Sequence, residues 1–174
     1  METTDWGFPK GQVAQTLRKI LSPQLTDHEA EAIVVCLLSH LMVEFKLNRV
    51  LYQWLRQDAP ISGKDEGATK AEDEMLERIV RMSFANKWEL IKPFFEIRFP
   101  NDAKDPKELN KLRNHIFHGR PIKDAKFDEQ PIADEKTVQE IFLTAQRLSE
   151  NFDKFEEMLD APHARLEKLE KSRP

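Results

Sequence analysis

The residues best suited to chemistry lie in one short run, residues 112–120, which reads LRNHIFHGR. A histidine side chain titrates near neutral pH and can act as a general base or a general acid. An arginine presents a fixed fork of donors to phosphate oxygens and keeps its charge. Metal-free RNA cleavage uses the ribose 2′-hydroxyl as nucleophile, so the protein must move protons and stabilise charge on phosphorus. Arg113 and His118 are residues of the types that this reaction needs.

The spacing of these residues fits the end of a helix. Asn114 and His118 are four positions apart and share one helix face. Arg113 and His118 lie about 140° apart on an ideal helix, so Arg113 must reach round or the last turn must unwind at Gly119. We expect Gly119 to end the helix. His118 then lies at a helix C-terminus, where the dipole favours a positive charge.

The pattern Arg113-Asn114-x-x-x-His118 resembles the R-x4-6-H signature of the HEPN superfamily, in which a polar residue, often Asn, follows the Arg. Gly119 is similar to the glycine of the common "RN…HG" form of this signature. Residues 47–51 (LNRVL) and 83–87 (SFANK) also resemble segments of helical HEPN families. The resemblance covers about residues 27–160.

The resemblance implies a metal-independent RNA endonuclease that acts as a homodimer, with two copies of the motif in one cleft. Arg113 would stabilise the phosphorane-like transition state, His118 would transfer protons and Asn114 would orient them. HEPN ribonucleases often serve as toxins or defence effectors, so an antitoxin or regulatory protein is an implied partner. The positions expected to hold the RNA backbone are Lys111, Arg120 and Lys123.

The charge distribution favours the same region for a polyanion. The chain has a formal net charge of −4, and this field repels nucleic acid at long range. Seven basic and three acidic residues lie between Lys104 and Lys126, which makes this stretch positive. We therefore expect RNA to bind near it.

Two other interpretations of these residues stay open. His118 can cap the helix carbonyls while Arg113 pairs with an acid such as Glu108 or Glu140. His115 and His118, three apart on one face, can belong to a metal site whose other ligands come from elsewhere. The alternative for the whole chain is a non-catalytic helical interaction or regulatory domain that retains the motif for structure or dimerisation.

The positions of apolar residues, prolines and caps predict the helices that must hold this run. A long helix from about His28 to Arg56, capped by Thr26 or Asp27, should be the most buried element. A short helix carrying Val13, Leu17, Ile20 and Leu21 is expected before Pro23. After a connection over 57–70, further helices are expected over 71–82, 84–95 and 105–118. Ser83 and Pro106 lie near the starts of the last two of these helices. After a surface loop over 119–133, Asp134 should cap a last long helix that breaks at Pro162.

The predicted fold is all-α, an up-and-down bundle of four to five helices, HEPN-like in form. We divide the chain into an N-terminal arm with a short helix (1–26), a helical bundle (27–160) and a charged tail (161–174). The apolar positions expected to face the core in the first long helix are Ile33, Leu37, Leu41, Phe45, Leu51 and Leu55.

Composition excludes several classes of protein. Charged residues make up 33% of the chain and glycines number five, which disfavours a turn-rich β fold. The single cysteine, Cys36, rules out an intramolecular disulfide and is expected to be a buried apolar residue. No signal peptide or stretch of about 20 apolar residues is readable, so we expect no membrane association and a cytoplasmic location. We expect no cofactor and no metal.

Overall fold

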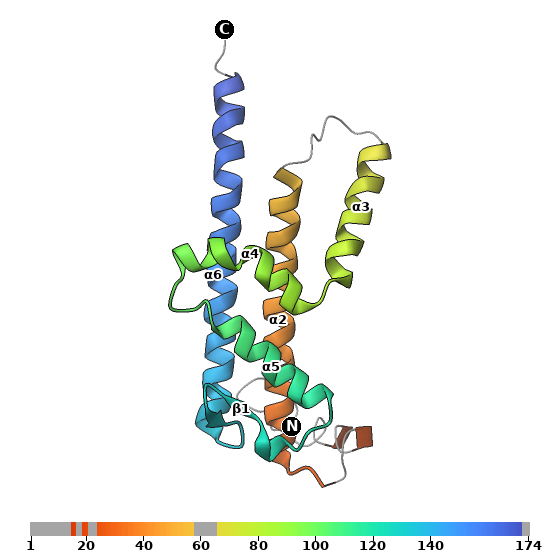
Figure 1. The fold of residues 1–174 in the computed structure, drawn as a ribbon, viewed down its shortest axis with the longest axis vertical. Helices are drawn as coiled ribbons and strands as arrows, with labels where there is room; N and C mark the ends of the chain where they lie inside the picture. The colour runs from red at the N-terminus through yellow and green to blue at the C-terminus, as the bar shows by residue number, and fades with distance from the viewer. Residues whose placement is uncertain (1–14, 17–18, 21–23, 58–65, 172–174) are drawn as a thin grey trace, which may run out of the picture. The chain divides into compact units, whose positions relative to one another are not determined.

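The computed structural model describes residues 15–16, 19–20, 24–57 and 66–171. Their regular elements are α2 (Asp27–Gln57), α3 (Glu66–Arg81), α4 (Phe84–Arg98), α5 (Asp105–Phe117), the 3₁₀ turn η1 (Ile122–Asp124), β1 (Lys126–Phe127), β2 (Gln130–Pro131) and α6 (Glu135–Lys171) (Figure 1). The predicted all-α class is confirmed, because the two strands have only two residues each. Most of the arm predicted over 1–26, including Val13, Leu17 and Leu21, lies outside the described residues.

The chain forms two compact units. The first unit comprises Met1–Leu41 and Glu108–Gln146, and it contains the candidate motif. Its buried apolar residues come from α2, α5, the β1–β2 hairpin and the start of α6, and they include Ile33, Leu112, Phe127, Ile132 and Ile141. This core holds the last turns of α5 in place.

The start of α2 has a reciprocal cap at Thr26, one of its two predicted caps. The Glu29 backbone N–H donates to Thr26 Oγ1 at 3.1 Å. The Glu29 carboxylate in turn accepts from the Thr26 backbone N–H at 2.9 Å. These two bonds satisfy donors that a helix start otherwise leaves unpaired.

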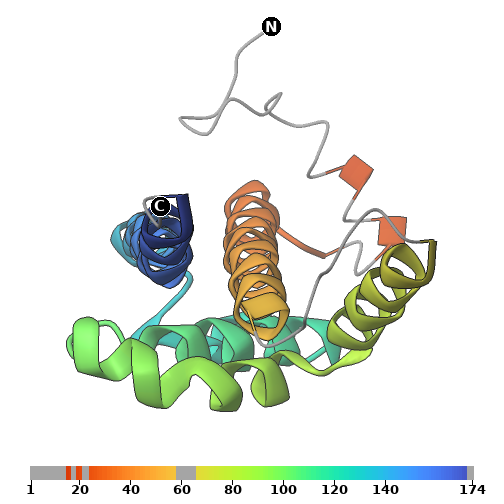
Figure 2. The same cartoon turned by 90° about the horizontal axis from the view of Figure 1, so that it is seen from above.

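The second unit comprises Met42–Lys107 and Arg147–Pro174. Within it α2 and α6 run side by side and α4 crosses them (Figures 1 and 2). An aromatic cluster fills its core. The ring centroids of Phe95 in α4 and Phe152 in α6 are 4.9 Å apart with the rings tilted, and Trp88 meets Phe95 edge-on at 5.4 Å. Aromatic side chains of this size dominate the burial energy of a small core.

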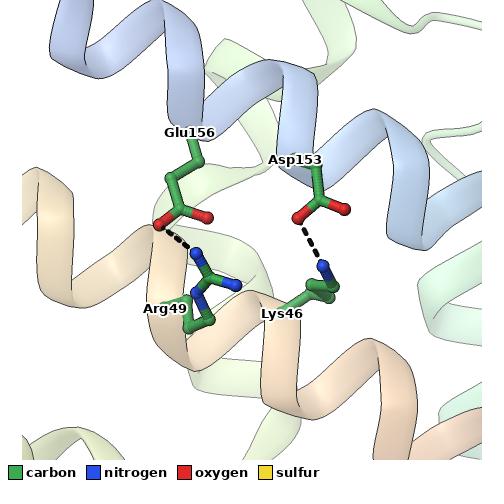
Figure 3. Close-up of polar contacts among 4 residues, drawn as sticks. All are labelled: Lys46, Arg49, Asp153 and Glu156. Carbon is green, nitrogen blue, oxygen red and sulfur yellow. Dashed lines mark hydrogen bonds and ion pairs between the residues drawn. The ribbon is translucent and has the colours of Figure 1, made fainter.

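Ion pairs also join the helices of the second unit. Lys46 of α2 pairs with Asp153 of α6, and Arg49 donates to Glu156 at 2.8 Å, one helical turn further along both helices (Figure 3). Lys87 of α4 is only 1% exposed and donates to Glu44 of α2 at 2.8 Å. A buried ammonium group is tolerated when it donates a hydrogen bond to an anion in this way.

Three predicted features differ from the structure. The helix α3 begins at Glu66, about five residues before the expected start, and it includes Gly67. The helix α6 continues past Pro162 to Lys171, so the expected break at Pro162 is absent. Leu41, Phe45 and Leu55 of α2, which were expected to face the core, are 58%, 61% and 38% exposed, because the core covers only one face of this helix.

The surface loop expected over residues 119–133 is instead a turn followed by a packed hairpin. Phe127 pairs with Gln130 across the hairpin, and the turn residues Asp128 and Glu129 have φ angles of 46° and 68°. Two consecutive residues with positive φ form the tight turn that usually contains Asn-Gly. The Asp-Glu pair lacks that signature, which is why the sequence suggested only a loop.

Candidate active site

The helix α5 is anchored by an apolar stripe that faces the core. Leu109, Leu112 and Ile116 are at most 6% exposed. Pro106 stands in its first turn, where a missing N–H costs no helical hydrogen bond. The remaining sides of the helix carry the candidate residues.

The helix α5 ends in a glycine cap, in which two backbone N–H groups beyond the helix donate to carbonyl groups of its last turn. Gly119 has a φ of +63°, its N–H donates to Ile116 O at 3.0 Å, and the Arg120 N–H donates to His115 O at 3.3 Å. This pair of bonds is the Schellman arrangement, which satisfies carbonyl groups at a helix end. The predicted end of the helix at Gly119 is therefore confirmed, and the turn directs Arg120 back toward the last helical turns.

A basic groove of about 470 Å³ follows the end of α5. Four of the predicted site residues line it: Lys111, Asn114, His118 and Arg120. Leu112, His115 and Lys126 complete the lining. Lys126, which the β1–β2 hairpin brings to the groove, is not among the site residues predicted from the sequence.

His118 is exposed at the rim of this groove. Its backbone N–H donates to Asn114 O at 3.0 Å. Its imidazole makes no hydrogen bond to any residue that the structure describes. The carbonyls of the last turn are instead bonded by the amides of Gly119 and Arg120. The interpretation of His118 as a side-chain cap therefore finds no contact to support it.

Arg113 is held by two neighbours on its own helix. Its Nη1 donates to Asn114 Oδ1 at 2.9 Å, and its guanidinium carbon lies 4.2 Å from the centre of the Phe117 ring. The suggested ion pair with Glu108 is absent, since Glu108 accepts from Lys111 Nζ at 2.6 Å. Arg113 is not among the lining residues of the groove, and its link to the groove is the side chain of Asn114.

Lys123, the remaining predicted RNA-binding residue, does not line this groove. It lines a second pocket of about 500 Å³, which is formed by the start of α2, the end of α5 and η1. Arg120 lines both the groove and this pocket, so the turn at Gly119 separates the two hollows. The structure thus brings Lys111 and Arg120 to the groove, whereas Lys123 shares only the second pocket with Arg120.

His115 supports the turn through a hydrogen bond between its side chain and the backbone six residues later. Its Nε2 lies 2.9 Å from the Pro121 carbonyl oxygen. A carbonyl group only accepts, so Nε2 carries the proton and Nδ1 is the second ring nitrogen left for another partner. No group of three or more His, Cys, Asp or Glu side chains able to hold a metal ion occurs in the described part of the chain.

Other reactive groups lie outside the groove. Burial raises the pKa of the Cys36 thiol to about 12, which agrees with its predicted role as a buried apolar residue and disfavours a thiolate nucleophile. Within residues 15–16, 19–20, 24–57 and 66–171, no helix has the length and apolar character to cross a membrane.

Comparison with known proteins identifies no relative of this chain. No protein-family model, no curated protein and no solved structure matches it. The residues and geometry of the groove are therefore the basis for assigning a function.

Proposed function

We propose that this chain is a metal-independent RNA endonuclease of the HEPN type, active as a homodimer. The observation that carries the proposal is the groove at the end of α5. It combines an exposed histidine, whose side chain has no hydrogen-bond partner among the described residues, with three cations and an amide. These are the groups needed to bind a phosphodiester and to move a proton beside it.

The reaction is an internal transfer at phosphorus. His118 removes the proton of a ribose 2′-hydroxyl, and the 2′-oxygen forms a bond to the adjacent phosphorus. The bond from phosphorus to the 5′-oxygen of the next nucleotide breaks, and that oxygen takes up a proton. The products end in a 2′,3′-cyclic phosphate and a 5′-hydroxyl, and no metal ion or oxidant is consumed.

Arg113 and Asn114 supply charge stabilisation and orientation. The Arg113–Asn114 hydrogen bond of 2.9 Å couples the guanidinium to an amide that lines the groove. A guanidinium moved to the phosphate can donate two parallel hydrogen bonds to the non-bridging oxygens. The amide of Asn114, four residues before His118, is suited to orient the groups between which protons move.

The cations of the groove hold the RNA backbone. Lys111, Arg120 and Lys126 line it, and Lys123 extends the positive surface beyond the turn. Neutralised phosphates release bound counterions, so RNA affinity should fall as salt concentration rises. This local attraction opposes the negative net charge of the whole chain.

A homodimer explains how one motif can serve both proton transfers. Each chain contributes one Arg113 and one His118, while the reaction needs one group to accept a proton and another to donate one. Two motifs in one cleft supply both groups. A role as a toxin or defence effector restrained by an antitoxin belongs to the same proposal.

The deciding experiment is an RNA cleavage assay in EDTA. We expect cleavage to persist, with products that end in 2′,3′-cyclic phosphate, and to be lost in Arg113→Ala. The matched control is Arg81→Ala, which removes an exposed arginine whose pair with Glu77 contributes little to stability. Cleavage that stops with EDTA and returns with a divalent ion would contradict the proposal and favour a metal site at His115 and His118.

The toxin role has a separate test in cells. Expression of the wild-type chain should arrest growth, and expression of Arg113→Ala at the same level should not. Equal growth with both proteins would contradict the toxin role. The nuclease proposal would then still be decided by the cleavage assay.

An interaction domain is the second candidate, and one observation favours it. Leu90, Phe94 and Ile97 follow one another at helical spacing on α4 and are 42%, 50% and 76% exposed. Apolar ridges of this kind often mark protein contacts. If the purified chain cleaves no RNA and substitutions at Phe94 and Ile97 abolish capture of a protein partner, this candidate replaces the nuclease.

A further inference from the structure

Phe117 is an exposed aromatic residue beside the candidate catalytic histidine. It directly precedes His118, and 63% of its surface is exposed. Phenylalanine is normally among the buried residues of a fold. The apolar stripe of α5 is formed by Leu109, Leu112 and Ile116, so the packing of this helix does not use the Phe117 ring.

The Phe117 ring is held by a cation on one side. Arg113, one helical turn earlier, places its guanidinium 4.2 Å from the ring centre. Arg113 is half-buried and also bonded to Asn114, so this contact restrains the ring. Most of the remaining ring surface stays open to solvent. A restrained aromatic ring loses little conformational freedom when a planar ligand stacks on it.

We propose that Phe117 is a stacking platform for one unpaired base next to the phosphate bound in the groove. This inference rests on the proposed nuclease function. Sequence-specific and single-strand RNA recognition commonly stacks splayed bases on aromatic side chains and arginine planes. Here Phe117 contacts the base with its open face; Arg113 packs on the other face in the chain without RNA and turns to the phosphate in the proposed reaction.

The helix geometry allows the phosphate and the base of one nucleotide to bind on different sides of α5, as a stacked base beside a bound phosphate requires. Phe117 and His118 are consecutive and point about 100° apart around the helix. The backbone phosphate occupies the groove beside His118, and the base turns over the helix edge onto Phe117. A base inside a duplex is stacked on both faces by its neighbours, so it cannot make this contact without leaving the helix.

The surroundings of Phe117 favour a nucleic acid over an apolar protein surface. Its neighbours include Arg113, one turn earlier in α5, and His118, which directly follows the helix. The adjoining groove carries Lys111, Arg120 and Lys126. Charged residues are depleted at the centres of protein interfaces. A polyanion with planar bases complements both the ring and the charges around it.

The test is a binding cycle that does not depend on cleavage. Short single-stranded RNAs that are 2′-O-methylated throughout cannot supply the nucleophile, and each member of the series lacks the base at one position. On the wild-type protein, one abasic position should weaken binding by about 5- to 150-fold, the range typical of one base–aromatic stack. On Phe117→Leu, binding of the intact RNA should weaken by a similar factor, and the abasic penalty should disappear.

Two control variants test whether the aromatic ring itself is responsible for the effect. Phe117→Trp keeps an aromatic face and should bind close to wild type, with the abasic penalty retained. Leu143→Ala removes an apolar side chain of α6 that is 57% exposed in the same unit, and it should leave binding unchanged. If Phe117→Leu fails to fold, loss of the abasic penalty in folded Phe117→Trp would still contradict the stack.

The outcomes separate this inference from the nuclease proposal. The stacking role of Phe117 is overturned if the abasic position weakens binding equally on wild type and Phe117→Leu, or if single- and double-stranded RNA bind with equal affinity. In either case the EDTA assay still decides the nuclease proposal. A lower oligomer mass for Phe117→Leu in light scattering also overturns it, because Phe117 is then a subunit contact. Stacking without any cleavage supports the platform and contradicts the nuclease, and no RNA binding by wild type overturns both.

Discussion

At the scale of single residues, His118 distinguishes catalysis from helix stabilisation. Its side chain is exposed and makes no hydrogen bond with the described residues, so His118→Ala should change stability by less than about 0.5 kcal/mol. That corresponds to a melting temperature within about 2 °C of wild type. A lost proton carrier should reduce the cleavage rate by about 10²–10⁴-fold. Both quantities are measured on the same sample, and full activity with a melting temperature several degrees lower would contradict the catalytic role.

Asp105, the first residue of α5, provides a pH test of a buried carboxyl. Burial raises the pKa of its side chain above the ordinary value of 3.8, although the hydrogen bond and charge of Arg147 at 2.9 Å oppose the rise. Since the folded protein then holds the proton more tightly than the unfolded chain does, this contribution to stability is fully present below pH 3.8. It is lost as the pH rises through the folded-state pKa.

Asp105→Asn should remove that loss of stability. The melting temperature of the variant, relative to wild type, should rise between pH 4 and neutral pH and then stay level. Asp124→Asn, which replaces an exposed carboxyl in η1, is the control. A difference between Asp105→Asn and wild type that is constant across this range would contradict the direction of the shift.

At the scale of elements, the cap at Gly119 connects the stability of α5 to the shape of the groove. A Cβ at this position meets no atom within 4 Å, so Gly119→Ala costs only the strain of a side chain at φ +63°. That strain is about 1–2 kcal/mol, or a melting temperature lower by about 2–8 °C. Gly119→Asn should lose less, because Asn tolerates this conformation. Equal losses in the two variants, measured by thermal unfolding, would show that contacts other than backbone conformation set the cost.

At the scale of the whole molecule, the proposed mechanism requires two chains. Light scattering should give twice the monomer mass at tens of micromolar protein. Mixing wild type with excess His118→Ala tests the shared cleft further, since mixed dimers have only one His118 side chain and should lose most of their cleavage activity. A monomer at these concentrations would remove the shared-cleft mechanism.

The sequence by itself determined the features that depend on neighbours a few residues away. The Ser83 cap of α4, whose Oγ accepts from the Asn86 N–H at 3.2 Å, was predictable from residue type alone. The end of α5 was predictable in the same way, because only a residue at ease with positive φ completes the Gly119 turn. Helix caps and periodic apolar stripes are local, so their energies do not depend on where the rest of the chain lies.

Only the tertiary structure decided which distant residues meet. Lys126 reaches the groove because Phe127 and Ile132 are buried and hold the hairpin, although Asp128-Glu129 has no typical turn signature. The buried ammonium group of Lys87 donates a hydrogen bond to the carboxylate of Glu44, 43 residues earlier in the chain. Such pairs depend on packing between segments far apart in the sequence, and neither residue of a pair signals its partner. The run 112–120 was therefore recognisable from sequence, whereas the groove that surrounds it was not.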